Sequence, residues 1–183
     1  MKNKILPTAV LSAICVVVAL LLSVINIFTG PVIQAELERK QAAALFEILG
    51  EDPETAEAPK AVEDLSSYTL PSEVTHVFHR ASDGVFIFQM SVSGKSSGML
   101  VMCAIDGEGK IIGTKCIDNA ETPGYAAPVF ELTEDNQAYK GMTSDSFKEV
   151  LVGGSTLTSK GYAKAIRAAL DARNIMIGGG SGE

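Results

Sequence analysis

The 183-residue sequence is poor in the side chains that most often carry metal-binding or nucleophilic chemistry, with two histidines and three cysteines. His76 and His79 lie in a segment expected to be a strand, where residues three apart point to opposite faces, so the pair is poorly placed to chelate a metal. No third histidine, cysteine or cluster of carboxylates joins them nearby. Neither histidine is close in sequence to a nucleophile motif. We therefore predict no metal site and no catalytic residues.

Charged side chains are missing between Lys4 and Glu36. The apolar run Ile5–Phe28 is longer than the ~20 residues that a transmembrane helix requires. It is also longer than the ~7–15-residue core of a cleavable signal peptide. No small-residue cleavage site follows it, and Cys15 lacks the small residues that precede a lipoprotein cysteine. We expect residues 1–35 to be a cytoplasmic tip and a permanent transmembrane anchor, with a signal peptide or a lipid anchor as alternatives.

The distribution of charge around this run predicts a topology. Lys2 and Lys4 precede it and should hold the N-terminus in the cytoplasm. All 22 acidic residues follow it with 13 of the 15 basic ones, so the remainder carries a net charge of −9. Such a surface argues against nucleic acid or anionic lipid as partners. We expect a single-pass protein of the cell (inner) membrane with its main domain outside the cytoplasm.

After the anchor the pattern changes twice. Residues 36–67 should comprise a stalk helix, Glu36–Gly50, that continues from the span, and an acidic, proline-containing linker, Glu51–Asp64. Residues 68–183 are expected to form one domain of antiparallel strands with flanking helices, an α+β fold. The expected strands are Val74–Phe78, Val85–Val92, Gly98–Ile105 and Ile111–Ile117, with hairpin turns at Ser82–Gly84 and Asp106–Gly109.

Two cysteines fall on neighbouring expected strands of the second hairpin. Cys103 and Cys116 would lie in a compartment that permits a disulfide. Residues paired across a hairpin meet disulfide geometry only in certain registers. The sequence therefore leaves their disulfide state open and favours an unpaired structural role.

A glycine pair leads into four hydroxyl side chains within five residues, and an Ala/Leu/Ile-rich segment follows through Arg173. Glycine lets the backbone turn and approach a ligand closely, and Ser or Thr supplies helix N-caps. The free N–H groups at such a helix start suit a phosphate. Two readings stand at this point: a phosphate-holding loop, and an ordinary cap after a glycine turn, which the spacing alone favours.

This segment resembles the flavin-attachment motif of the FMN-binding domain in the G subunit of Rnf complexes and the C subunit of Nqr. That motif runs Asp-x-x-Ser-Gly-Ala-Thr-x-Thr-Ser, and the threonine after its alanine carries FMN through a phosphoester. The resemblance places the acceptor at Thr156 and the loop around it at Gly154, Ser155, Leu157, Thr158 and Ser159, with Thr158 and Ser155 as fallback acceptors. The departures are Val150 for Asp, Gly153 for Ser and Ser155 for Ala.

A second resemblance to the same family lies upstream, in Glu121-Thr122-Pro123-Gly124. Thr-Pro-Gly is by itself turn chemistry. In the family, Glu-Thr-Pro-Gly follows a hairpin with Asp-x-x-Gly-x-Ile, which this chain has at 106–111. The resemblance implies that Glu121, Thr122 and Gly124 lie beside the flavin ring. Tyr125 is expected either to stack on the ring or to serve as plain packing. A third similar segment is Asn136–Gly141, a Gln and an aromatic ahead of a glycine.

The resemblance implies a membrane-anchored flavoprotein that transfers electrons through covalent FMN. It further implies an Rnf-type ion-translocating ferredoxin:NAD oxidoreductase, in which this chain would be a subunit of the translocase. Its expected partners are polytopic membrane subunits and a flavin transferase that attaches the cofactor. The alternatives are an FMN carrier for another extracytoplasmic reductase, an Nqr-type complex, and a scaffold subunit that has lost its flavin.

Overall fold

The computed structural model describes residues 2–178, with side chains from Pro7 onward. The side chains of Lys2 and Lys4, on which the predicted topology depends, lie outside this part. The chain divides into two compact units, Met1–Arg39 and Lys40–Glu183.

The first element is a long helix, α1 (Lys2–Leu49), which runs through both the apolar stretch and the expected stalk. Within Pro7–Leu49 the helix contains an 18-residue stretch with a mean hydropathy of 2.8, and it is long and apolar enough to cross a membrane. The helix ends where the stalk was expected to end. Gly50 follows in a left-handed conformation with φ +68°, the usual device for stopping a helix. The helix is therefore continuous from the apolar stretch through Leu49.

The second unit is built on a five-stranded sheet in which each strand pairs antiparallel with the next along the chain, in the order β1-β2-β3-β4-β5. The strands are β1 (Lys60–Ala61), β2 (Val74–Arg80), β3 (Val85–Val92), β4 (Met99–Ile105) and β5 (Ile111–Asp118). The four longer strands confirm the sequence prediction. The two-residue β1 was missed because its segment is acidic and proline-flanked, and it is a strand only through pairing with β2.

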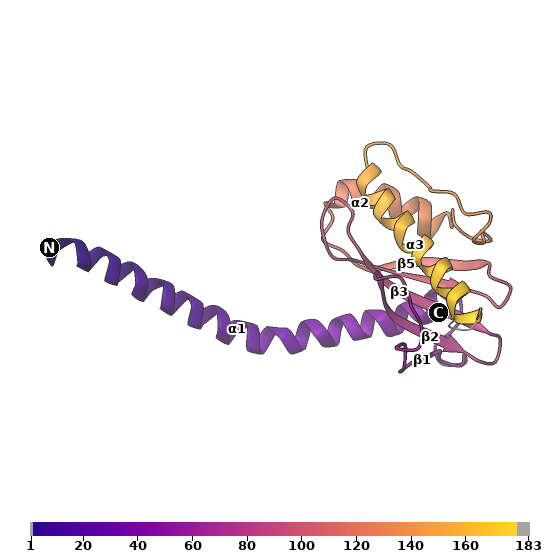
Figure 1. Cartoon of the computed structure of the whole chain (residues 1–183), viewed down its shortest axis with the longest axis horizontal. Helices are drawn as coiled ribbons and strands as arrows, with labels where there is room; N and C mark the ends of the chain where they lie inside the picture. Colours follow the sequence, from indigo (N-terminus) through magenta and orange to yellow (C-terminus); the bar gives the residue numbers. More distant parts are fainter. Residues whose placement is uncertain (1, 179–183) are drawn as a thin grey trace. The chain divides into compact units, whose positions relative to one another are not determined.

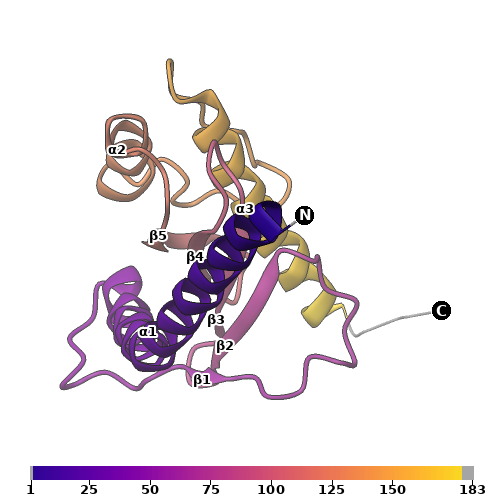
Figure 2. The ribbon, with the colours of Figure 1, turned by 90° about the vertical axis from the view of Figure 1, so that its left-hand side faces the viewer.

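Both faces of the sheet are covered within this unit. The C-terminal helix α3 (Thr156–Ile177) lies along one face (Figures 1 and 2), where Ile166 and Leu170 pack with Phe88, Met90 and other strand residues in the larger core. On the other face, the last turns of α1 contribute Ala44, Leu45 and Ile48 to a second cluster of buried residues. Successive residues of a strand contribute to opposite cores, because their side chains point to opposite faces of the sheet.

A short helix, α2 (Pro123–Phe130), follows β5 and continues directly into one turn of π-helix, η1 (Glu131–Asp135). The prediction of a simple turn at Thr-Pro-Gly was wrong. Thr122 occupies the N-cap position in extended conformation and Pro123 begins the helix, where its missing N–H is harmless. Figure 1 shows α2 beyond the β5 edge of the sheet.

Candidate functional site

The glycine-rich loop before α3 makes the turn that the sequence predicted. Gly154 has φ +80°, which side-chain-bearing residues rarely adopt, while Gly153 has an ordinary φ. Ser155 then occupies the N-cap position of α3, yet it makes no side-chain capping hydrogen bond. A serine therefore stands at the N-cap as predicted, but the side-chain hydrogen bond expected of it is not formed. In the described part of the chain, the first N–H groups of α3 have no side-chain cap, so they stay available to an anion.

The four hydroxyl side chains of this segment differ sharply in exposure. Ser155, Thr158 and Ser159 are buried, with exposed fractions of 6%, 1% and 0%. The Ser159 hydroxyl donates to the backbone oxygen of Ser155 at 2.9 Å and accepts from the N–H of Val152 at 3.1 Å. Thr156, at the first position of α3, is exposed. Of the four, it alone presents its hydroxyl-bearing side chain to solvent.

Glu121 connects the Glu-Thr-Pro-Gly segment to two other parts of the chain. Its carboxylate is buried and accepts a hydrogen bond at each oxygen: Oε1 from the N–H of Ser96 and Oε2 from the hydroxyl of Thr158, both at 2.7 Å. Ser96 belongs to the loop between β3 and β4, and Thr158 to the first turn of α3. These hydrogen bonds could not be predicted from the sequence, because the three segments are far apart along the chain.

Two glycines allow these segments to approach so closely. A Cβ on Gly94 would lie 2.7 Å from Oε1 of Glu121 and 2.9 Å from Cα of Thr158. A Cβ on Gly161 would lie 2.6 Å from the backbone oxygen of Ser93. The β3–β4 loop is therefore seated directly on the start of α3, with no room for a methyl group at either contact.

Beside this junction lies an open pocket of about 320 Å³. We call it the Thr156 pocket; its lining residues are Lys95, Tyr125, Gly154, Ser155, Thr156, Leu157 and Thr158. The ammonium of Lys95 lies 4.3 Å from the centroid of the Tyr125 ring, a cation–π contact. Tyr125 and Leu157 are large apolar side chains left exposed, at 43% and 61%. The pocket thus combines an anion-compatible helix end, a cation and two apolar surfaces.

The structure brings most of the predicted site residues together, though in different roles. Tyr125 and the stretch Gly154–Thr158 line the pocket, whereas Glu121, Thr122, Gly124 and Ser159 are not among its lining residues. Gly124 lies in α2 with an ordinary φ. Lys95, another lining residue, belongs to the polar segment that connects β3 and β4.

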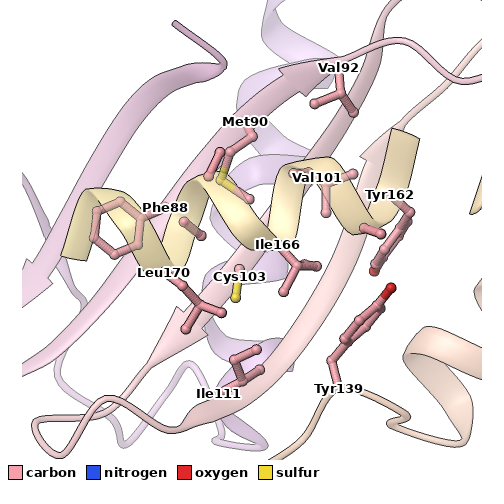
Figure 3. Close-up of a cluster of buried hydrophobic side chains, with 14 of the residues drawn as sticks. Phe88, Met90, Val92, Val101, Cys103, Ile111, Tyr139, Tyr162, Ile166 and Leu170 are labelled. Atoms are coloured by element: carbon pink, nitrogen blue, oxygen red, sulfur yellow. The ribbon is translucent and has the colours of Figure 1, made fainter. Parts of the chain in front are cut away.

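The third family-like segment has a structural role. Tyr139 is fully buried and its ring packs parallel to that of Tyr162 in α3, with centroids 6.2 Å apart. Figure 3 shows the two side chains in the core with their hydroxyl groups pointing toward each other. The Tyr139 oxygen also accepts a hydrogen bond from the N–H of Val150 at 3.1 Å. Val150, which stands where the family motif has Asp, is partly buried against the same core.

The histidines and cysteines do not extend the site. Among the described residues, no three His, Cys, Asp or Glu side chains gather as metal ligands would. His79 stacks on Phe86 with centroids 4.2 Å apart. Both strand cysteines are free thiols, and they are not register partners, because Cys103 faces Thr114 and Cys116 faces Val101. Burial raises the pKa of Cys116 to about 12 and that of Cys103 still further, so neither is a reactive thiolate.

The pocket meets the requirements of a flavin mononucleotide. Its volume lies at the lower end of the ~300–1,000 Å³ that small-molecule pockets span. The uncapped N–H groups of α3 and the ammonium of Lys95 suit a phosphate, and the ring of Tyr125 suits a flat aromatic group. Thr156, another lining residue, supplies an exposed hydroxyl.

A comparison with protein families agrees with this chemistry. The family model described as FMN-binding domain matches residues 94–171, a range that contains every lining residue of the Thr156 pocket and also Glu121. No curated protein matches the chain. The matched range begins at the glycine that lets the β3–β4 loop rest on α3 and ends within α3 itself. On this evidence, the chain carries an FMN-binding domain over residues 94–171.

Proposed function

We propose that this protein is an electron carrier whose FMN is bound covalently to Thr156 through a phosphoester. The observation that carries the proposal is the position of Thr156: an exposed hydroxyl at the first residue of α3, inside a pocket of the FMN-binding domain. When bound, FMN would supply the redox chemistry, and the protein would supply attachment, orientation and electrostatics.

Different lining residues would hold different parts of the FMN. The start of α3 and the ammonium of Lys95 favour the negative charge of the phosphate, while Tyr125 and Leu157 offer apolar surface to the ring system. A helix end contributes only ~0.3–1 kcal/mol to the binding of an anion at an exposed site. That is too little to retain a cofactor in an open pocket, so a covalent tether is the physically reasonable solution.

Attachment would need an external enzyme, because the residues that line the pocket include no histidine or carboxylate to activate the hydroxyl. We propose a flavin transferase that uses FAD. The Thr156 oxygen forms a bond to the phosphorus of the FMN half, the pyrophosphate bond breaks and AMP leaves. The hydroxyl proton passes to a base of the transferase. No electrons are exchanged in this step, and Thr156 acts as a tether rather than as a catalytic nucleophile.

We further propose that the protein is the G subunit of an Rnf-type ion-translocating ferredoxin:NAD oxidoreductase. The similarity of three segments in the family's order supports this, as does the apolar helix at the N-terminal end of the chain. In this proposal α1 anchors the protein in the cell membrane and the flavin domain lies outside the cytoplasm. Polytopic subunits of the complex would be its partners. A carrier for another extracytoplasmic reductase would share the flavin and lack these partners.

The flavin proposal is tested by co-expressing the full chain with a flavin transferase and measuring its intact mass and its fluorescence in a denaturing gel. We expect one FMN adduct on the wild-type chain and none on Thr156→Val, with Ser155→Ala as a matched control that keeps the adduct. Fluorescence that persists in Thr156→Val would exclude Thr156 as the acceptor. A wild-type chain without an adduct would favour the scaffold alternative. Membership of the complex is tested separately, by co-purification of polytopic subunits from solubilised native membranes.

A further inference from the structure

Glu121 lies outside the Thr156 pocket, yet it holds two of the segments that form it. Its Oε1 accepts from the N–H of Ser96, next to the pocket residue Lys95, and its Oε2 accepts from the hydroxyl of Thr158, two residues after the acceptor. At Gly94 and Gly161 these segments approach so closely that an added Cβ would require the neighbouring atoms to shift. The carboxylate therefore fixes the β3–β4 loop relative to the first turn of α3.

This arrangement also determines which hydroxyl faces solvent. The Thr158 hydroxyl donates to Glu121, so that side chain is drawn inward and is 1% exposed. In a helix, residues 156 and 158 point about 200° apart, because each residue advances the helix by about 100°. Holding Thr158 inward therefore holds Thr156 outward. The two threonines are only two residues apart in the sequence, so we expect a transferase to distinguish them by their exposure.

We propose that Glu121 is the positioning residue for flavin attachment: by binding Ser96 and Thr158 together, it presents Thr156 and withholds Thr158. This inference rests on the proposed function, since it concerns the same attachment reaction. It assigns to Glu121 a role in acceptor selection rather than contact with the flavin ring.

The test uses the full chain, co-expressed or incubated with a flavin transferase and FAD, with three variants. Glu121→Ala removes both acceptors. Glu121→Gln keeps an oxygen for Ser96 and a polar partner for Thr158, so it should restore the geometry. Glu131→Ala removes an exposed glutamate and serves as the matched control. The readouts are the rate of adduct formation and the position of the adduct by peptide mass spectrometry.

We expect Glu121→Ala to form the Thr156 adduct at least about tenfold more slowly, the effect of losing about 1.4 kcal/mol of alignment. Part of its adduct should move to Thr158 and disappear in Glu121→Ala/Thr158→Val. Glu121→Gln and Glu131→Ala should label Thr156 alone, at close to the wild-type rate. A general loss of stability would slow labelling without moving its position.

Amide hydrogen exchange provides a second measurement that does not depend on the reaction. Loss of the carboxylate should deprotect the Ser96 amide in Glu121→Ala while the amides of β4 stay protected. If Glu121→Ala does not fold, Thr158→Val serves as a second test. It removes one of the two hydrogen bonds of Glu121 in a nearly isosteric way and should also slow labelling of Thr156. Wild-type rate and position in folded Glu121→Ala or in Thr158→Val would overturn this inference alone. Absence of any adduct on the wild-type chain would overturn the proposed function and this inference with it.

Discussion

Glu134, in the π-helical turn η1, should make the stability of the domain fall as the pH rises. Its side chain is 13% exposed; Oε1 accepts a hydrogen bond from the N–H of Cys116 at 2.9 Å, and Oε2 lies 3.9 Å from the ammonium of Lys115. Burial is the main cause that raises its pKa from the ordinary 4.5 to about 7, and the two neighbours only partly oppose it. The native protein therefore binds this proton more tightly than the unfolded chain.

The sign and the window follow from that difference. Between about pH 4.5 and about pH 7 the native state holds the proton and the unfolded state releases it, so the free energy of unfolding decreases as the pH rises. A shift of this size corresponds to about 3 kcal/mol in full. We expect about 1–2 kcal/mol, because the carboxylate keeps some contact with water and has Lys115 nearby. Above about pH 7 both states are ionised, and the cost of burying the charge is fully present.

The measurement is urea unfolding of the full chain in non-ionic detergent, followed by circular dichroism because the chain has no tryptophan. Glu134→Gln keeps an oxygen for the Cys116 N–H and removes the ionisation, so it should gain about 1–2 kcal/mol over wild type between about pH 5 and about pH 8. Taking the difference between the two chains cancels every other titrating group. Glu131→Gln, on an exposed neighbour, should show no such gain. If Glu134→Gln follows the wild-type pH profile, the carboxylate is not held neutral by burial.

Three further predictions concern packing and cysteine chemistry. Gly161→Ala should lower the free energy of unfolding in urea by about 1–3 kcal/mol, because the added Cβ meets a backbone oxygen of the β3–β4 loop. Gly153→Ala is the control and should be nearly neutral, because a Cβ there meets nothing within 4 Å. Ile166→Ala should cost about 2–5 kcal/mol in the same assay, because the side chain is fully buried between α3 and the sheet. Without any reductant, Cys103 and Cys116 should both react with a thiol reagent after unfolding and should resist it in the native state. A disulfide between them, detected by mass, would contradict the register.

The sheet and its main helices could be predicted because local pattern and tertiary role agree there. The strands from Val74 to Asp118 are rich in β-branched and aromatic residues and are separated by turn residues, and both signals are local. The long apolar helix follows from length and composition in the same way. Where a tertiary contact decides the outcome, local pattern failed. Lys60–Ala61 becomes a strand only through β2, and Thr122–Pro123 starts a helix although its chemistry equally suits a turn.

At the site, the sequence placed Thr156 and Tyr125 in one group by resemblance, and the structure lines one pocket with both. It did not show that the hydroxyls of Thr158 and Ser159 are taken up by internal hydrogen bonds. That distinction depends on a carboxylate 37 residues away and on glycines that permit a close approach. Sequence spacing contains no information of this kind, because the contact with the carboxylate is set by how the β3–β4 loop lies on α3.

Val150 bears on two separate requirements: what the domain needs in order to fold and, in the proposed function, what a transferase would need in order to act. An aspartate stands at this place in the family motif, yet here the side chain packs against the core and the backbone N–H bonds to the oxygen of buried Tyr139. The backbone bond is independent of side-chain identity, so the loop can keep its path with either residue. The pocket, the exposed Thr156 side chain and the Glu121 hydrogen bonds are all in place without the aspartate. Under the proposed function, the missing aspartate would therefore matter for recognition by a transferase, while the exposure of Thr156 depends on other residues.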